Sequence, residues 1–167
     1  MTGIEQLCPN CGLCCDSTLF ADVELQKRDD PKRLAKLGLT LEKKGRTKIA
    51  FAQPCACFDG QLCQIYHDRP QRCRAFDCGL LKRVDEGKMT AAAALKKIAD
   101  TKKRADKVRT LLRLLGQLDE RMALTHRYAE AMSAPVDFSD ETKASAHGEL
   151  MMSVNDLMHR LQKDFLT

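Results

Sequence analysis

The chain has 167 residues, a net charge of +5 and a hydrophobic fraction of 44% that includes nine cysteines. No stretch approaches the roughly 20 apolar residues of a membrane-spanning helix, and the first residues lack the basic and apolar regions of a secretory signal. We therefore expect a cytoplasmic protein with no membrane partner. In that reducing compartment, dense cysteines bind metals more often than they form disulfides, and an odd number argues against a closed disulfide framework.

The first predicted unit, residues 1–88, is a small cysteine-rich module that contains all nine cysteines. Alternating apolar and polar residues predict short extended segments over residues 17–26 and 47–53. Between them, an Asp-Pro pair followed by a glycine predicts a short helix over residues 31–37.

A turn signal and one more helix complete this unit. The Asp-Gly pair at residues 59–60 is typical of a tight hairpin turn. Cys57 and Cys63 flank this pair, so a hairpin would bring their sulfur atoms near each other. We expect one further short helix over residues 79–87.

The second predicted unit, residues 89–167, contains no cysteine and is a helical extension. Apolar residues recur every three, four or seven positions over residues 90–132, which predicts a long amphipathic helix, with Gly116 as the point where it would bend or divide. A polar loop and a helix over residues 148–166 follow. The two apolar stripes would bury each other in an antiparallel helical hairpin. The predicted fold class is therefore α+β: a metal-bound module with short strands and a hairpin, followed by a helical hairpin.

The N-terminal cysteine run has an unusual spacing. Cys8, Cys11 and Cys14 form two overlapping C-x2-C steps, which resemble the run that wraps an iron–sulfur cluster, whereas zinc modules normally use two separate C-x2-C pairs. The remaining cysteines provide no second C-x2-C pair. Cys14 and Cys15 are adjacent, and neighbouring side chains diverge, so their sulfurs would serve different metals or different corners of one cluster.

A longer pattern carries a family resemblance. The block CPNCGLCC at residues 8–15, followed by CQIYHDRPQRCRAFDC at residues 63–78, resembles the CxxCxxCC cysteine-cluster family, also called YkgJ-like, over about residues 8–81. The family usually has another residue at the position of Cys57, which leaves Cys57 as an accessory ligand, a substitute for Cys55 or a bystander. The resemblance implies a zinc- or iron-chelating domain whose metal ligands would be Cys8, Cys11, Cys14, Cys15, Cys55, Cys63, Cys73 and Cys78.

We favour an iron–sulfur cluster of the [4Fe–4S] type as the cofactor, with structural zinc in an interaction module as the alternative. Around the ligands, Arg69 and Arg74 would either donate hydrogen bonds to thiolate or sulfide or pair with Asp68 and Asp77. Tyr66 would pack in the small core beside the site. No familiar hydrolase or kinase motif is present, so neither catalytic residues nor a reaction can be predicted.

A basic segment offers a further hypothesis. Residues 96–113 hold eight basic and two acidic residues. These basic residues surround an apolar helical stripe, and no aromatic residues are present for stacking on bases. We therefore favour a solvated helix face over nucleic-acid binding. If the chain has a partner, we favour a protein that binds the helical hairpin over a nucleic acid. The candidate phosphate contacts in the disfavoured hypothesis are Lys102, Lys103, Arg104 and Lys107.

Overall fold

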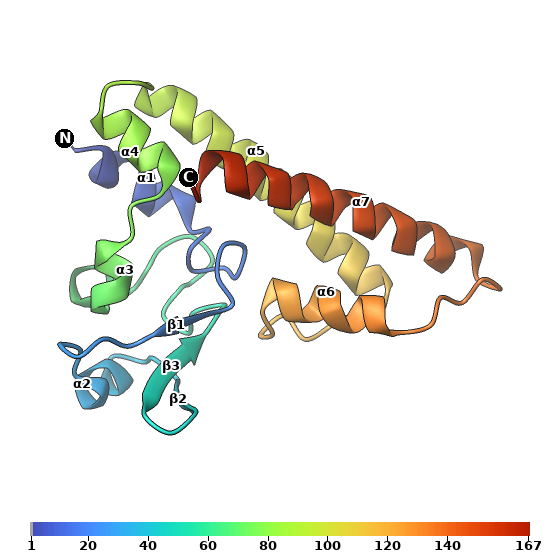
Figure 1. Cartoon of the computed structure of the whole chain (residues 1–167), viewed down its shortest axis with the longest axis horizontal. Helices are drawn as coiled ribbons and strands as arrows, with labels where there is room; N and C mark the ends of the chain where they lie inside the picture. The colour runs from blue at the N-terminus through green and yellow to red at the C-terminus, as the bar shows by residue number, and fades with distance from the viewer. Residues whose placement is uncertain (1) are drawn as a thin grey trace.

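The structure, a computed structural model that describes residues 2–167, places a small sheet beneath one end of a pair of long helices (Figure 1). The predicted α+β class is confirmed. In chain order the elements are α1 (Gly3–Cys11), β1 (Asp22–Glu24), α2 (Pro31–Lys36), β2 (Leu41–Lys44), β3 (Lys48–Ala52), the 3-10 helix η1 (Tyr66–Asp68), α3 (Gln71–Ala75), α4 (Gly79–Asp85), α5 (Ala91–Leu114), α6 (Leu124–Ser133) and α7 (Glu141–Asp164).

The sheet is antiparallel, with the strand order β1-β3-β2. Phe51 of the central strand lies opposite Val23 on one side and Leu41 on the other, and its side chain is only 2% exposed. β2 was not predicted, because three of its four side chains are charged and exposed, as suits an edge strand. The buried residues around Phe51, which we call the sheet core, are Val23, Leu34, Leu39, Phe51, Cys55, Cys57 and Ile65.

Local capping explains where several short helices begin and end. The Asp30 carboxylate accepts hydrogen bonds from two backbone N–H groups at the start of α2, which confirms that predicted helix. The helix predicted over residues 79–87 is α4. α1 was not predicted; the Thr2 amide donates to Glu5 Oε2 over 2.8 Å at its start, and Gly12 ends it in the left-handed conformation with φ +74°.

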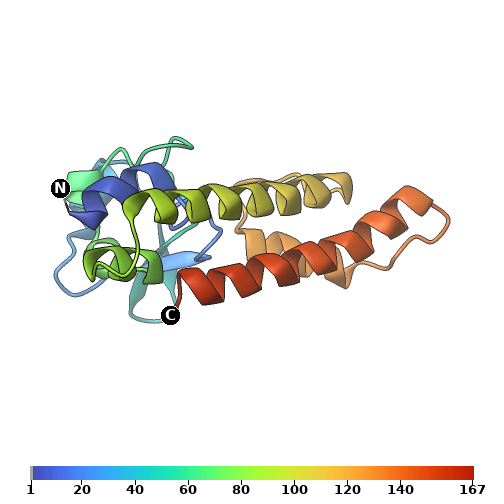
Figure 2. The same cartoon turned by 90° about the horizontal axis from the view of Figure 1, so that it is seen from above.

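The long helices α5 and α7 lie side by side and antiparallel, with α6 beside them (Figures 1 and 2). The single helix considered over residues 90–132 is divided into α5 and α6, and the break falls at Gly116, whose φ is +85°. α7 begins at Glu141 and not at residue 148, because the Asp140 carboxylate accepts a hydrogen bond from the Lys143 amide over 3.1 Å and so caps the helix earlier.

The apolar stripes of these helices meet in a second and larger core. The buried residues of this second cluster, which we call the helical core, are Leu7, Leu13, Leu80, Leu81, Ala94, Ile98, Ala105, Val108, Leu111, Leu112, Leu124, Ala131, Ala146, Leu150, Leu157, Leu161 and Phe165.

Within residues 2–167, no helix is both long and apolar enough to cross a membrane.

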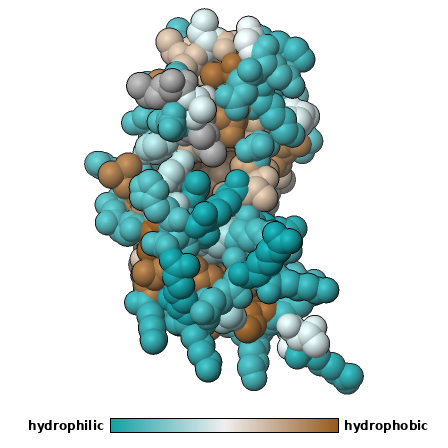
Figure 3. Space-filling view, turned by 90° about the vertical axis from the view of Figure 1, so that its left-hand side faces the viewer, coloured by the Kyte–Doolittle hydropathy of each residue, from teal (hydrophilic) through white to brown (hydrophobic). Residues whose placement is uncertain are grey.

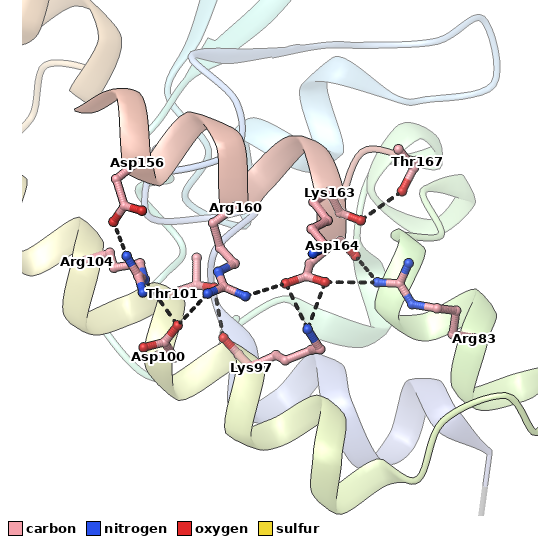
Figure 4. Close-up of polar contacts among 10 residues, drawn as sticks. All are labelled: Arg83, Lys97, Asp100, Thr101, Arg104, Asp156, Arg160, Lys163, Asp164 and Thr167. Carbon is pink, nitrogen blue, oxygen red and sulfur yellow. Dashed lines mark hydrogen bonds and ion pairs between the residues drawn. The ribbon is translucent and has the colours of Figure 1, made fainter. Parts of the chain in front are cut away.

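One buried carboxylate joins α4, α5 and α7 (Figure 4). The Asp164 side chain is 3% exposed and accepts hydrogen bonds from Lys97 Nζ at 3.0 and 3.2 Å and from Arg160 at 3.3 Å. Arg83 of α4 lies 3.4 Å from the same carboxylate and also donates to the Asp164 carbonyl over 2.8 Å. Burial opposes the negative charge, but the bonds from Lys97 and Arg160 outweigh it and lower the pKa of Asp164.

The end of α7 also touches the backbone that follows the last cysteine. The Gly79 amide donates to the Phe165 carbonyl over 2.9 Å, and a Cβ at Gly79 would lie 2.7 Å from the Thr167 carbonyl oxygen. Only glycine allows this approach. Cys78, the residue that precedes Gly79, is therefore held against the C-terminal end of the chain.

Replacing Asp164 by asparagine should lower the free energy of unfolding by about 2 kcal/mol, because three partly exposed cations lose their shared anion. Urea unfolding measures this change. Asp156→Asn on the same helix is the matched control: Asp156 is 55% exposed and pairs with Arg104, so its loss should cost at most about 1 kcal/mol. Equal losses in the two variants would contradict a structural role for the buried carboxylate.

Candidate metal centre

A cavity of about 580 Å³ lies between the two cores. Its walls include Leu7, Leu81 and Ile98 from the helical core and Phe51 and Ile65 from the sheet core. Eight of the nine cysteines also line it, namely Cys8, Cys11, Cys14, Cys15, Cys55, Cys63, Cys73 and Cys78.

The outer surface at this end of the molecule is mostly hydrophilic, unlike the lining of the cavity. Figure 3 shows that hydrophilic side chains cover most of this face, and that long hydrophilic side chains project furthest at the bottom, where the sheet and α2 lie. Hydrophobic side chains are visible only in patches between them. The cavity, in contrast, is lined mainly by apolar and thiol side chains, which favours soft sulfur ligands over hydrated ones.

Three of the cavity cysteines lie on or at the helices α1 and α4. Cys8 and Cys11 are three residues apart on α1 and so share one face of that helix. Cys78 is the residue that precedes α4. The two helices pack together, and the Gly3 amide at the start of α1 donates to Asp85 Oδ1 over 3.0 Å. All three cysteines pack against the helical core.

The other group lies around the sheet. Cys55 belongs to the sheet core, and Cys15, Cys63 and Cys73 pack against it. The Cys55 amide donates to the Cys15 carbonyl over 2.8 Å, which ties the N-terminal run to this segment. Cys63 forms an isolated antiparallel bridge with Phe58, as the predicted Asp-Gly turn requires.

Cys57 does not line the cavity. It is buried, and its thiol donates to the Leu37 carbonyl at 3.5 Å, on the side of α2. Burial raises the pKa of Cys57, and the neighbouring Cys63 thiolate raises it further, so the two residues are close, as the turn predicts. Among the three roles considered for Cys57, this geometry favours the bystander.

Burial raises the pKa of six of the eight cavity thiols, because a thiolate loses its hydration there. The pKa is raised to about 11 for Cys8 and Cys73 and to about 12 for Cys11 and Cys55. Neighbouring thiolates add to the effect of burial: Cys78 raises the pKa of Cys8, and Cys63 raises that of Cys73. A bound cation would remove this penalty, because it compensates the charge of the thiolates around it.

The donor set therefore fits a thiophilic metal. All nine cysteines are free thiols. Within residues 2–167, no three cysteine, histidine, aspartate or glutamate side chains form a closed metal site; the eight thiols are distributed around the cavity wall. The fit rests on the chemistry of the donors: eight soft ligands, mostly desolvated, in one cavity. Gln53, a buried wall residue, also has an amide oxygen without a hydrogen-bond donor.

Arg69 and Arg74, the two arginines predicted beside the metal ligands, differ in position: only Arg69 lines the cavity. Arg69 lines the cavity; its guanidinium lies 3.7 Å above the centre of the Tyr66 ring, and its Nε donates to the Tyr66 carbonyl over 2.8 Å. The charge of Arg69 lowers the pKa of both Cys8 and Cys73, in opposition to burial. Of the two predicted roles, this position favours compensation of thiolate charge.

Arg74 lies outside the cavity wall and supports the loop instead. Its Nε donates to the Arg69 carbonyl over 2.8 Å, and its guanidinium donates to the His67 carbonyl. Asp68, one of the two predicted acidic partners, pairs with Arg33 of α2. Arg74 thus holds the segment that carries Arg69 in place.

The four candidate phosphate contacts on α5 mostly have partners within the chain. Arg104 pairs with Asp100 and Asp156, and Lys107 pairs with Glu149. Lys102 donates to a backbone carbonyl at the end of α1, and Lys103 lies near Asp100, whose pKa it helps to lower. These contacts give the nucleic-acid hypothesis no support.

Sequence reasoning missed the roles of Arg109 and Gly79. Arg109 was counted in the basic segment, but its guanidinium donates to the Asp16 carbonyl over 3.1 Å and to Thr18 Oγ1 over 3.0 Å, and so fixes the segment after Cys15 to α5. The only sequence feature that indicates a role for Gly79 is its position directly after the last motif cysteine, and this indication is weak. The contacts of both residues join segments that are far apart in the chain.

These observations define a class of protein: a cysteine-cluster protein with a thiol-lined cavity between two small cores. A family model described as a putative zinc- or iron-chelating domain matches residues 7–107, and the chain belongs to this CxxCxxCC family. The match continues past the predicted boundary at residue 88 into α5. No curated protein and no solved structure matches the chain significantly.

The raised thiol pKa values predict how the stability of the metal-free, reduced protein depends on pH. Unfolded thiols ionise near pH 9, whereas folded Cys8 and Cys11 keep their protons up to about pH 11 and 12. The folded state therefore binds more protons in this interval, and the free energy of unfolding falls as the pH rises through it. Urea unfolding at pH 8.0 and 10.5 should show a loss of more than about 1 kcal/mol. A Cys11→Ser/Cys55→Ser variant should lose less unfolding free energy between these two pH values. An equal loss would contradict the assignment of the pH dependence to these thiols.

Gly12→Ala should be clearly more destabilising than Gly87→Ala. Both glycines end a helix with similar positive φ values, +74° and +69°, but a Cβ at Gly12 would lie 2.6 Å from the Phe58 ring, whereas nothing lies within 4 Å of a Cβ at Gly87. The positive φ alone costs about 1–2 kcal/mol in each variant. Thermal unfolding should separate the two variants by at least another 1 kcal/mol or so. Equal melting temperatures would show that the Phe58 contact is unimportant.

Proposed function

We propose that the protein uses the thiol-lined cavity to hold an iron–sulfur centre of the [4Fe–4S] type. The observation that carries the proposal is the separation of the cysteines: all eight that match the family pattern line one cavity, while the ninth, Cys57, does not line it and donates to the Leu37 carbonyl. A cluster of this kind would supply one-electron transfer or a Lewis-acidic iron.

Two features support iron–sulfur over a single zinc ion. The overlapping spacing of Cys8, Cys11 and Cys14 is typical of cluster ligands. The cavity, about 580 Å³, is also larger than one ion with sulfur ligands at about 2.3 Å requires.

The residues around the thiols have distinct roles in this proposal. Arg69 compensates negative charge beside Cys8 and Cys73, and its stacking on Tyr66 fixes its position. The apolar walls reduce the access of water to the sulfurs and so influence how easily the centre is reduced. Arg109 and Gly79 hold the segments next to Cys15 and Cys78 against the helices.

One observation favours structural zinc as a second candidate. The sheet core has seven buried residues, and two of them are cysteines. Such a small core gains stability from a metal that crosslinks its segments, which is the usual role of structural zinc. In this case the protein would have no redox chemistry, and the helical hairpin would serve as a partner surface.

Protein purified without oxygen tests the proposal. We expect a brown protein with absorbance near 400 nm and iron and acid-labile sulfide in equal amounts, because thiolate-to-iron charge transfer absorbs there. Colourless protein with stoichiometric zinc would support the second candidate. Protein without any bound metal would contradict both.

The cysteines offer a matched pair of variants for the same experiment. Cys55→Ser should lose metal, because Cys55 lines the cavity, whereas Cys57→Ser, two residues away and equally buried, should keep the full metal content. The reverse pattern would show that Cys57 replaces Cys55 as a ligand and that the cavity does not define the site.

A further inference from the structure

We propose that, on metal binding, the eight thiols divide into two separate four-thiolate sites that meet at the Cys14–Cys15 peptide bond. This inference rests on the proposed function and specifies how its ligands are divided. The helical set is Cys8, Cys11, Cys14 and Cys78. The sheet set is Cys15, Cys55, Cys63 and Cys73.

The first argument comes from packing. Cys8, Cys11 and Cys78 pack against the helical core, whereas the members of the sheet set belong to the sheet core or pack against it. No cavity cysteine packs against both clusters as the structure describes them for residues 2–167. Two cores that present different cysteines to one cavity favour two ligand sets over one mixed set.

The second argument comes from the elements that carry the thiols. The helical set spans the end of α1 and the start of α4, two helices that pack on each other and on α5. The sheet set is joined by backbone contacts, since the Cys55 amide bonds to the Cys15 carbonyl over 2.8 Å and Cys63 follows the turn that begins at Phe58. Each set thus has its own scaffold.

Cys14 completes the helical set. It lines the cavity and directly follows Leu13, which is fully buried in the helical core. Cys15, the next residue, packs against the sheet core, and its carbonyl accepts the hydrogen bond from the Cys55 amide over 2.8 Å. The side chains of Cys14 and Cys15 therefore have different surroundings.

Charge balance explains the position of Arg69. A four-thiolate site with a divalent metal or an oxidised [4Fe–4S] cluster carries a charge of about −2, so two adjacent sites repel each other. Arg69 lines the cavity that both sets share, and the hydrogen bond from its Nε to the Tyr66 carbonyl over 2.8 Å fixes its position there. One guanidinium in the shared wall thus reduces the repulsion between the two sites.

The test compares two double variants of the full chain, both purified without oxygen. Cys8→Ser/Cys11→Ser should bind half the metal of the unsubstituted protein and keep only the sheet set protected from iodoacetamide. Cys55→Ser/Cys63→Ser should also bind half and keep only the helical set protected. Peptide mass spectrometry identifies the alkylated cysteines, and Cys57→Ser, with full metal content, is the control.

The outcomes separate this inference from the proposed function. A double variant that keeps its helical circular dichroism but binds no metal, or protection that crosses the two sets, would overturn the division. No metal in the unsubstituted protein would instead contradict the proposed function. If a double variant does not fold, partial chelation of the unsubstituted protein decides: thiols should become reactive in two groups of four, and any other grouping overturns the inference.

Discussion

The structure depends on one constraint: eight ionisable sulfur atoms share a mostly apolar cavity between two small cores. As free thiols, six of them stay protonated because burial and the neighbouring thiolates raise the pKa, to about 12 at Cys11. As metal ligands they would lose their protons and gain a cation instead. The stability of the cysteine-rich part and its affinity for metal are therefore two aspects of the same free energy.

The helices that follow the cysteines support the cysteine-rich segments through direct contacts. α5 supports α1 and α4, and the C-terminal end of α7 contacts the backbone directly after Cys78. The buried Asp164 joins α4, α5 and α7, and Arg109 fixes the segment after Cys15. The family match, which runs to residue 107, also includes much of α5. The segments that carry Cys15 and Cys78 are thus held directly by the long helices.

Local patterns in the sequence were sufficient to predict α2, β3 and α4 and to mark Gly116 as the point of a bend or a division, because capping residues, alternation and glycine act over a few positions. α1 was not predicted because Pro9 lies inside it and proline disfavours a helix interior, although Thr2 and Glu5 form a capping pair. The eight cavity cysteines followed from the family pattern, whereas the position of Cys57 outside the cavity wall, bonded to the Leu37 carbonyl, depends on where α2 packs. Contacts between distant segments, such as those of Arg109, leave no local pattern to recognise.

The most direct test of the central claim is X-ray absorption spectroscopy at the edge of the metal in protein purified without oxygen. The cavity predicts a first shell of sulfur alone, four atoms per metal at about 2.3 Å, with a second shell of iron at short distance if the centre is an iron–sulfur cluster. A first shell made mainly of nitrogen or oxygen would contradict the account, because the metal would then lie outside the thiol-lined cavity.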